Sequence, residues 1–166
     1  MQAGAVHKIL VIAPLRVSRD TWPTEVHKWD HLSTFRTAVL VGDMKARTTA
    51  LNADADVYII NRENIKWLVE YYRTNRRRWD FDTVVIDELS SFKNHQSQRY
   101  KFLHQIRPFV HRWIGLTGTP TSNGWMDLWA EIGILDGGER LGRFIGRYRE
   151  AYFKPGSYNP STGIVY

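Results

Sequence analysis

The chain has 166 residues, 43% of them hydrophobic, with no cysteine and a net charge of +6 at pH 7. This length suits one domain with a buried core, and the lack of cysteine excludes disulfides and thiolate metal sites, leaving Mg²⁺ as the natural metal candidate. The positive charge is typical of proteins that bind phosphate backbones, and no apolar run reaches the roughly 18 residues that cross a bilayer, so we expect a cytoplasmic protein with no membrane partner.

The first predicted elements are a strand and a helix. Residues 7–13 (HKILVIA) form a short apolar run that ends at Pro14, which is typical of a strand buried on both faces. Trp22, Val26 and Trp29 then recur with helical spacing. Because proline is tolerated only in the first turn of a helix, Pro23 predicts a helix that starts near residue 21.

The same alternation continues along the chain. Apolar runs predict strands at residues 37–41, 56–60, 83–86 and 113–116, and helical stripes predict helices around 65–72, from 97 onward, at 125–132 and at 141–148. Strands that alternate with helices indicate a three-layer α/β fold with a mostly parallel sheet. We assign residues 1–153 to this domain and expect 154–166, which are rich in proline and glycine, to be a loop or a frayed tail.

An acidic pair, Asp87-Glu88, follows directly after the predicted strand at 83–86. In parallel α/β sheets the ligands lie at the carboxyl ends of the strands. One carboxylate there can hold Mg²⁺, while its neighbour orients or deprotonates an attacking water molecule. The alternative is that the pair only caps the next helix.

A hydroxyl-rich loop, Thr117-Gly118-Thr119-Pro120, follows the predicted strand at 113–116. It should reach the same edge of the sheet as the acidic pair, where its hydroxyl groups could contact carboxylates or phosphates. Taken alone, it is also compatible with an ordinary turn.

Two segments, VVIDELSSFKN (84–94) and LTGTPTSN (116–123), resemble the Walker B motif and motif III of SNF2-type (superfamily 2) helicase-like ATPases. VIAPLRVSRDTW (11–22) resembles motif Ia, YIINREN (58–64) motif Ib, and residues 128–150 the segment after motif III. The DEL-S form of motif II is familiar from phage-type members of the family, and Leu89-Ser90 replaces the commoner Ala-His.

The resemblance implies a role for each matching residue. Asp87 would be the Mg²⁺ ligand and Glu88 the catalytic base of ATP hydrolysis. The residues that couple the nucleotide to the nucleic acid would be Ser90, Thr117, Gly118 and Thr119. The residues that approach the backbone of DNA, expected to be double-stranded, would be Pro14, Leu15, Arg16, Ser18 and Arg62.

One motif of that family has no counterpart in the sequence. A P-loop requires Gly-x-x-x-x-Gly-Lys-Ser/Thr, and no glycine of this chain is followed by lysine. The resemblance therefore implies an incomplete RecA-like first lobe without the P-loop strand and helix, from a protein of a bacterial or phage-infected cell. ATP and Mg²⁺ would serve the complete enzyme, and this chain alone should bind neither tightly and should be a poor ATPase.

The missing pieces leave other functions open. A P-loop segment and a second RecA-like lobe are expected as partners, and the strand at 113–116 should be an exposed apolar sheet edge that invites self-association. The chain could also be a non-catalytic module that binds DNA or protein, or one half of a split ATPase.

Arginine, tryptophan and histidine side chains elsewhere in the sequence are further candidates for ligand binding. The arginines at 73 and 76–78 are interpreted as a solvated loop rather than a phosphate clamp. Trp22, Trp29, Trp125 and Trp129 fall on apolar helical stripes, so we expect them to pack in the core. The histidines show no metal-ligand spacing.

Overall fold

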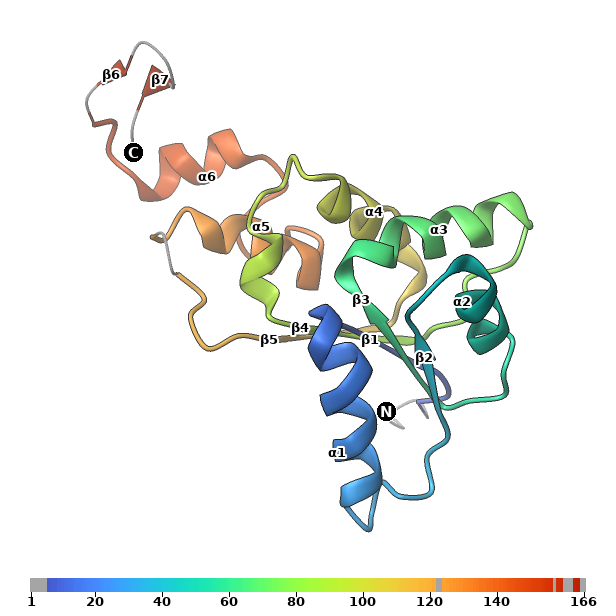
Figure 1. Cartoon of the computed structure of the whole chain (residues 1–166). Helices are drawn as coiled ribbons and strands as arrows, with labels where there is room; N and C mark the ends of the chain where they lie inside the picture. Colours follow the sequence, from blue (N-terminus) through green and yellow to red (C-terminus); the bar gives the residue numbers. More distant parts are fainter. Residues whose placement is uncertain (1–5, 122–123, 157, 160–162, 165–166) are drawn as a thin grey trace, which may run out of the picture.

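The computed structural model describes residues 6–121, 124–156, 158–159 and 163–164. Its centre is a five-stranded parallel sheet with the order β2-β3-β1-β4-β5 (Figure 1). The strands are β1 (Ile9–Ala13), β2 (Thr37–Leu40), β3 (Val57–Asn61), β4 (Thr83–Asp87) and β5 (Arg112–Leu116). Each lies at a predicted apolar run, which confirms the expected α/β class.

The central strands are buried on both faces, as their apolar sequences require. On one face, Leu10, Ile12 and Ile86 pack beneath α2 (Met44–Leu51), α3 (Ile65–Thr74), α4 (Gln98–Ile106) and α5 (Asp127–Asp136). On the other face, Val11 and Ile59 form a smaller cluster that Trp22 of α1 (Trp22–Lys28) covers. Figure 1 shows α1 on the opposite side of the sheet from α3 and α4. Each such side chain contributes about 1.5–3 kcal/mol when it is fully buried.

Local hydrogen bonds explain where two helices begin. Ser97 was expected to start a helix, and its hydroxyl accepts a hydrogen bond of 3.3 Å from the backbone N–H of Tyr100 at the start of α4. The helix α2 was not predicted. Asp43 caps it by accepting from the N–H of Ala46 at 2.8 Å, but its only buried residue is Leu51, so the sequence carries almost no apolar stripe.

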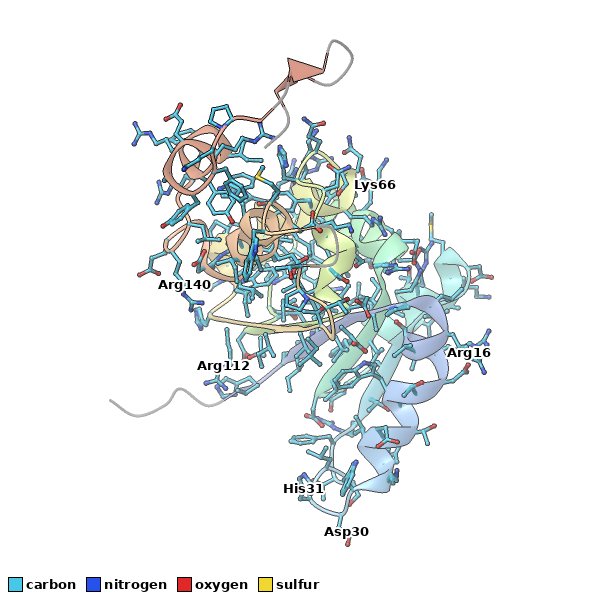
Figure 2. The ribbon with its side chains drawn as sticks, turned by 90° about the vertical axis from the view of Figure 1, so that its left-hand side faces the viewer. Arg16, Asp30, His31, Lys66, Arg112 and Arg140 are labelled. Atoms are coloured by element: carbon cyan, nitrogen blue, oxygen red, sulfur yellow. The ribbon has the colours of Figure 1, made fainter. Side chains whose placement is uncertain are left out.

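The helix after β1 begins earlier than predicted. Helical backbone starts at Leu15, passes through a π-helical turn at Val17–Thr21 and continues as α1. Pro23 has no N–H to donate to the preceding turn, and the wider turn before it accommodates this loss. Figure 2 shows Arg16 projecting outward near the start of this segment, with Asp30 and His31 beyond its far end.

Two of the four tryptophans expected in the core are exposed instead. Trp29 is 51% exposed because α1 ends just before it, and Trp125 is 67% exposed because α5 begins only at Asp127. Trp22 and Trp129 are partly buried and pack against the two core clusters, as predicted. The arginines at 73, 76 and 78 are exposed, and the one at 77 is half-buried.

The end of the chain departs from the sequence-based expectation in a similar way. The last helix, α6 (Ile145–Tyr152), buries Tyr148 but leaves Phe144 66% exposed at its N-cap. Within residues 154–166, expected as a loop or tail, β6 (Tyr158–Asn159) pairs antiparallel with β7 (Gly163–Ile164). These strands have only two residues each, too few to produce an alternating pattern. Residues 157, 160–162, 165 and 166 lie outside the described part.

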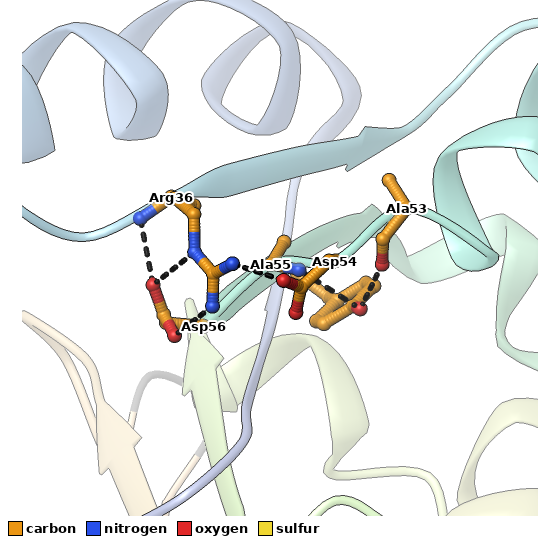
Figure 3. Close-up of polar contacts among 6 residues, drawn as sticks. Arg36, Ala53, Asp54, Ala55 and Asp56 are labelled. Carbon is orange, nitrogen blue, oxygen red and sulfur yellow. Dashed lines mark hydrogen bonds and ion pairs between the residues drawn. The ribbon is translucent and has the colours of Figure 1, made fainter.

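An ion cluster joins the amino ends of β2 and β3 (Figure 3). The guanidinium of Arg36 donates to Asp56 at 3.0 and 3.2 Å and also contacts Asp54, while the Arg36 N–H donates to Asp56 at 2.8 Å. These contacts hold the pKa of Asp56 below its ordinary value. Nearby, the Tyr58 hydroxyl donates to the carbonyl of Ala53 at 2.6 Å. None of the helices in the described part has the length and apolar character needed to cross a membrane.

Candidate active site

The predicted site residues all follow carboxyl ends of parallel strands. β1 ends at Ala13, β3 at Asn61, β4 at Asp87 and β5 at Leu116, and these ends lie along one edge of the sheet. In the β4–β5 register, Asp87 is opposite Leu116, so the acidic pair and the threonine loop leave neighbouring strands at the same level. Ile12 is opposite both Ile60 and Ile86, which places the segment after β1 between the other two.

Asp87 is held by a side chain from the helical segment that follows β1. The indole N–H of Trp22 donates to Oδ2 of Asp87 at 2.9 Å. Within the described residues, Oδ1 of Asp87 takes part in no hydrogen bond. A half-buried carboxylate with one fixed and one available oxygen suits Mg²⁺, which uses few protein ligands and keeps water or phosphate oxygens.

Glu88 occupies a strained backbone conformation. Its φ of 62° and ψ of 61° lie in the left-handed region, which costs a residue other than glycine about 1–3 kcal/mol and is enriched at functional sites. The side chain is exposed, and the hydroxyl of Ser90 donates to its Oε1. Ser90 therefore contacts the second acid of the pair directly.

Close packing beneath Glu88 fixes its turn. The 3₁₀ turn η3 (Leu89–Phe92) follows Glu88 and buries both Leu89 and Phe92. A Cβ atom at Gly115 of β5 would lie 2.6 Å from Cδ2 of Leu89 and 3.2 Å from Cδ2 of Leu135, so a larger residue would force these side chains to move. The glycine of β5 thus has a packing role that the sequence did not reveal.

The loop after β5 adds hydroxyl groups beside the acids. The backbone N–H of Thr119 donates to the hydroxyl oxygen of Thr117 at 3.3 Å, which folds the loop back on itself. Thr117 is half-buried, whereas Gly118 and Thr119 are exposed. The loop therefore offers polar groups to a ligand at the edge that also carries Asp87.

The residues expected to approach DNA differ in their accessibility. Leu15 and Arg16 are exposed, and Pro14 is half-buried. Arg62, in the 3₁₀ turn η2 (Arg62–Asn64), is half-buried and forms an ion pair of 3.0 Å with Glu63. Figure 2 shows Arg16 and Arg112 far apart on the molecule, as expected for the opposite ends of the sheet.

Ser18 is not available to a ligand, contrary to the sequence-based expectation. Its side chain is fully buried, and its hydroxyl lies 3.1 Å from the carbonyl oxygens of both Ala13 and Ile60. It thus joins the ends of β1 and β3. The sequence around a serine does not show which way its hydroxyl points, so the burial of Ser18 could not be predicted.

A buried acid near the pair was also missed. Glu131 of α5 is 1% exposed, and neither of its oxygens has a hydrogen-bond partner among the described residues. Burial, together with the charges of Asp127 and Glu88 and partly opposed by Lys93, raises its pKa to about 7. Lys93 is itself 3.6 Å from Asp127. A carboxylate on an otherwise apolar helical stripe was the available signal.

The described residues contain no group of three or more histidine or acidic side chains placed to hold a metal ion. A metal ion at this edge would therefore depend on Asp87, with water or substrate phosphate oxygens completing its coordination. The remaining element of a nucleotide site, a phosphate-binding loop of the Gly-Lys type, does not occur in the sequence. The described site thus offers carboxylates and hydroxyl groups at one sheet edge without a phosphate-binding loop.

Comparisons with known proteins give the family and the fold of the chain. The protein-family model described as the SNF2-related domain matches residues 1–137 of the sequence. A putative protein, p41, of Acyrthosiphon pisum secondary endosymbiont phage 1 is 41% identical over 151 residues, which are 87% of this chain and 32% of that protein. The ISWI chromatin-remodeling complex ATPase ISW1 of Saccharomyces cerevisiae is 31% identical over 76% of this chain and 11% of its own length.

A solved structure shares the fold. The Sulfolobus solfataricus SWI2/SNF2 ATPase core in complex with dsDNA matches with a TM-score of 0.72 and 26% identity, over 90% of this chain and 29% of that one. This match confirms the RecA-like type of sheet expected from the sequence. The chain spans about a third or less of each of these relatives.

Proposed function

Because the chain belongs to the SNF2-related family, we propose that residues 1–153 form part of the first lobe of a DNA-stimulated ATPase. The observation that carries this proposal is the convergence of Asp87, Glu88 and the Thr117–Thr119 loop on one sheet edge, with Asp87 oriented by Trp22. The similarity to a phage protein supports a role inside an infected bacterial cell.

In the proposed mechanism the two acids have different tasks. Asp87 would hold Mg²⁺, and the metal would supply positive charge beside the phosphate oxygens of ATP. Glu88 is exposed and lies outside the strand, so its carboxylate can reach a water molecule, orient it and accept its proton. Ser90 donates to that carboxylate and so positions it. Thr117, Gly118 and Thr119 connect this centre to the nucleic acid.

Phosphate binding requires groups beyond those in these 166 residues. The sequence has no glycine followed by lysine, and arginine fingers in related phosphoryl-transfer enzymes contribute about 10³–10⁵ in rate. The P-loop segment and a second lobe are therefore the partners we propose. The chain alone should bind ATP weakly, and tight Mg²⁺-dependent ATP binding by the purified chain would contradict this part of the proposal.

The metal site can be tested by NMR with Mn²⁺ as a paramagnetic substitute for Mg²⁺. The Trp22 indole N–H contacts Asp87 at 2.9 Å, so its resonance should broaden early in a Mn²⁺ titration. Asp87→Asn should abolish this broadening, whereas Glu139→Gln, which alters an exposed acid elsewhere, should preserve it. Equal broadening in the wild type and Asp87→Asn would refute Asp87 as the metal ligand.

The DNA surface can be tested separately. We propose that Pro14, Leu15, Arg16 and Arg62 contact the backbone of duplex DNA, because they follow β1 and β3 beside the acidic pair. Each lost phosphate contact should lower the slope of log affinity against log salt by about 0.9. Arg16→Ala and Arg62→Ala should each do so, and Arg112→Ala, at the other end of the sheet, should not. An affinity for DNA that does not change with salt concentration would refute contact with the DNA backbone.

The open edge of β5 supports a second candidate function. Within the described residues, β5 pairs with β4 alone, and its side chains Ile114 and Leu116 are 39% and 42% exposed. Unpaired edges attract further strands. The chain could therefore act as half of a split ATPase whose partner supplies a strand, or self-associate as a non-catalytic DNA- or protein-binding module. A monomeric chain at high concentration, by sedimentation, would count against self-association.

A further inference from the structure

A cavity of about 600 Å³ lies away from the proposed active site. It is partly open to solvent and is lined by residues of α4, the 3₁₀ turn η4 (Arg107–Phe109), α5 and the loop between α5 and α6. Its lining combines three cations with three aromatic rings: Lys101, Arg107, Arg143, Tyr100, Trp129 and Phe144. None of the described lining residues is acidic, and none belongs to the proposed ATPase site.

The positive charge of the cavity is not neutralised by the protein. Within the described part of the chain, no ion pair joins Lys101, Arg107 or Arg143 to a carboxylate. Nε of Arg107 is buried and has no hydrogen-bond partner there. The pKa of His95, another lining residue, is lowered by burial and by the charges of Arg149 and Lys101. An anion would compensate both the unpartnered Nε of Arg107 and this positive potential.

Ring contacts hold the aromatic side of the cavity in place. The His95 ring packs edge-on against Trp129 with a centroid distance of 5.2 Å, and His104 stacks on Tyr100 at 6.2 Å. The indole N–H of Trp129 donates to the carbonyl of Gly142 at 2.9 Å, which fixes the ring against the α5–α6 loop. Such preorganised rings lose little conformational entropy when a planar ligand binds.

Glycines let the backbone approach these groups. Gly137 ends α5 with a φ of 72°, and a Cβ atom there would lie 3.3 Å from Nε of Arg107. A Cβ atom at Gly133 would lie 3.2 Å from the hydroxyl of Tyr100. Larger residues at either position would press on the cationic and aromatic groups, so the shape of the cavity depends on both glycines.

We propose that this cavity binds a nucleotide, with its base against the aromatic wall and its phosphate on Lys101, Arg107 and Arg143. The volume lies within the range of about 300–1,000 Å³ typical of ligand pockets. Aromatic faces accept any base by stacking, and arginine and lysine bind phosphate. The nucleotide could be free or part of a single strand. This site goes beyond the proposed ATPase function because the two share no residue.

The experiment titrates the purified chain with AMP, with a short single-stranded oligodeoxyadenylate and with inorganic phosphate. EDTA is present throughout, so that the proposed metal site does not contribute. Binding is followed by calorimetry and by the Trp129 indole N–H resonance. The variants Lys101→Ala and Arg143→Ala remove exposed cations, Phe144→Ala removes an exposed ring, and Arg78→Ala removes an exposed cation elsewhere. Thermal unfolding checks that each variant is folded.

We expect AMP to bind and to shift the Trp129 resonance. Lys101→Ala and Arg143→Ala should each weaken binding by about tenfold, the loss expected for one charge-assisted hydrogen bond. Phe144→Ala should also weaken it, and Arg78→Ala should leave it unchanged. Binding of the oligonucleotide but not AMP, with the same variant pattern, supports the site and identifies a nucleic-acid strand as the source. Phosphate binding as tightly as AMP, equal effects of Arg78→Ala, or no binding of either nucleotide would overturn the proposal.

Discussion

Replacing Glu131 by glutamine should remove a pH dependence of stability that the wild-type chain carries between mild acid and mild base. Glu131 is buried, and its carboxylate oxygens have no hydrogen-bond partner among the described residues. Burial raises its pKa from 4.5 to about 7. The folded state therefore holds the proton more tightly than the unfolded state. Its contribution to stability is fully present below pH 4.5 and is lost as the pH rises through about 7.

The size of the effect follows from the two pKa values. At about 1.4 kcal/mol per pKa unit, the rise from 4.5 to about 7 corresponds to at most about 3–4 kcal/mol of unfolding free energy. A neutral amide of the same shape cannot ionise. Glu131→Gln should therefore resemble the wild type in acid and be more stable than it in base, by an amount approaching this limit.

The assay is urea unfolding followed by tryptophan fluorescence, at about pH 5 and about pH 8, with EDTA present. The informative quantity is the loss of unfolding free energy between the two pH values, compared between wild type and variant, because the other titrating groups are common to both. Glu139→Gln changes an exposed acid and should retain the wild-type loss. If Glu131→Gln loses as much stability as the wild type, the carboxylate is not buried in the way described.

The remaining predictions concern the turn and the carboxylate of the proposed active site. Trp22→Phe should lower the unfolding free energy by about 1 kcal/mol and weaken Mn²⁺ binding, because Asp87 loses its 2.9 Å hydrogen bond; unchanged Mn²⁺ affinity would argue against a positioning role. Glu88→Gly should stabilise the chain by up to about 1 kcal/mol in urea unfolding, because glycine adopts a φ of 62° without strain. Arg76 has a φ of 51°, so Arg76→Gly should give a similar gain in unfolding free energy. A loss of unfolding free energy at both positions would show that neither backbone is strained. Gly115→Ala should cost about 1–3 kcal/mol, since a Cβ atom would lie 2.6 Å from the overlying leucine, and wild-type stability would refute this packing.

The sequence was sufficient to place the strands and the edge that carries the site. Buried parallel strands have continuous apolar runs, and the residue after each run must lie at the carboxyl edge, so Asp87 and Thr117 could be assigned to one edge without a structure. The resemblance, and not the apolar runs, led to the expectation that the strand at 113–116 lies at an edge of the sheet. The edge position of β5 agrees with that expectation for the described residues.

Contacts between distant segments could not be predicted. Trp22 lies 65 residues from Asp87, and its apolar spacing gave no reason to expect a polar partner for its indole N–H. Glu131 was hidden in a helical stripe, where only tertiary packing decides whether a carboxylate is buried. The helix α2 escaped detection because a surface helix held by its cap and by sheet contacts needs little amphipathic pattern.

The helical segment that follows β1 has a mechanical consequence. Near its start it exposes Arg16, proposed to contact duplex DNA, and farther along it carries Trp22, whose indole holds Asp87. The fully buried Ser18 lies between Arg16 and Trp22 in the sequence, and its hydroxyl is hydrogen-bonded to the ends of β1 and β3. Arg16 and Trp22 lie in one helical segment, so a displacement of Arg16 on DNA contact would be passed to Trp22 and to its hydrogen bond with Asp87. The proposed DNA contact and the orientation of the proposed metal ligand would then depend on the position of the same helix.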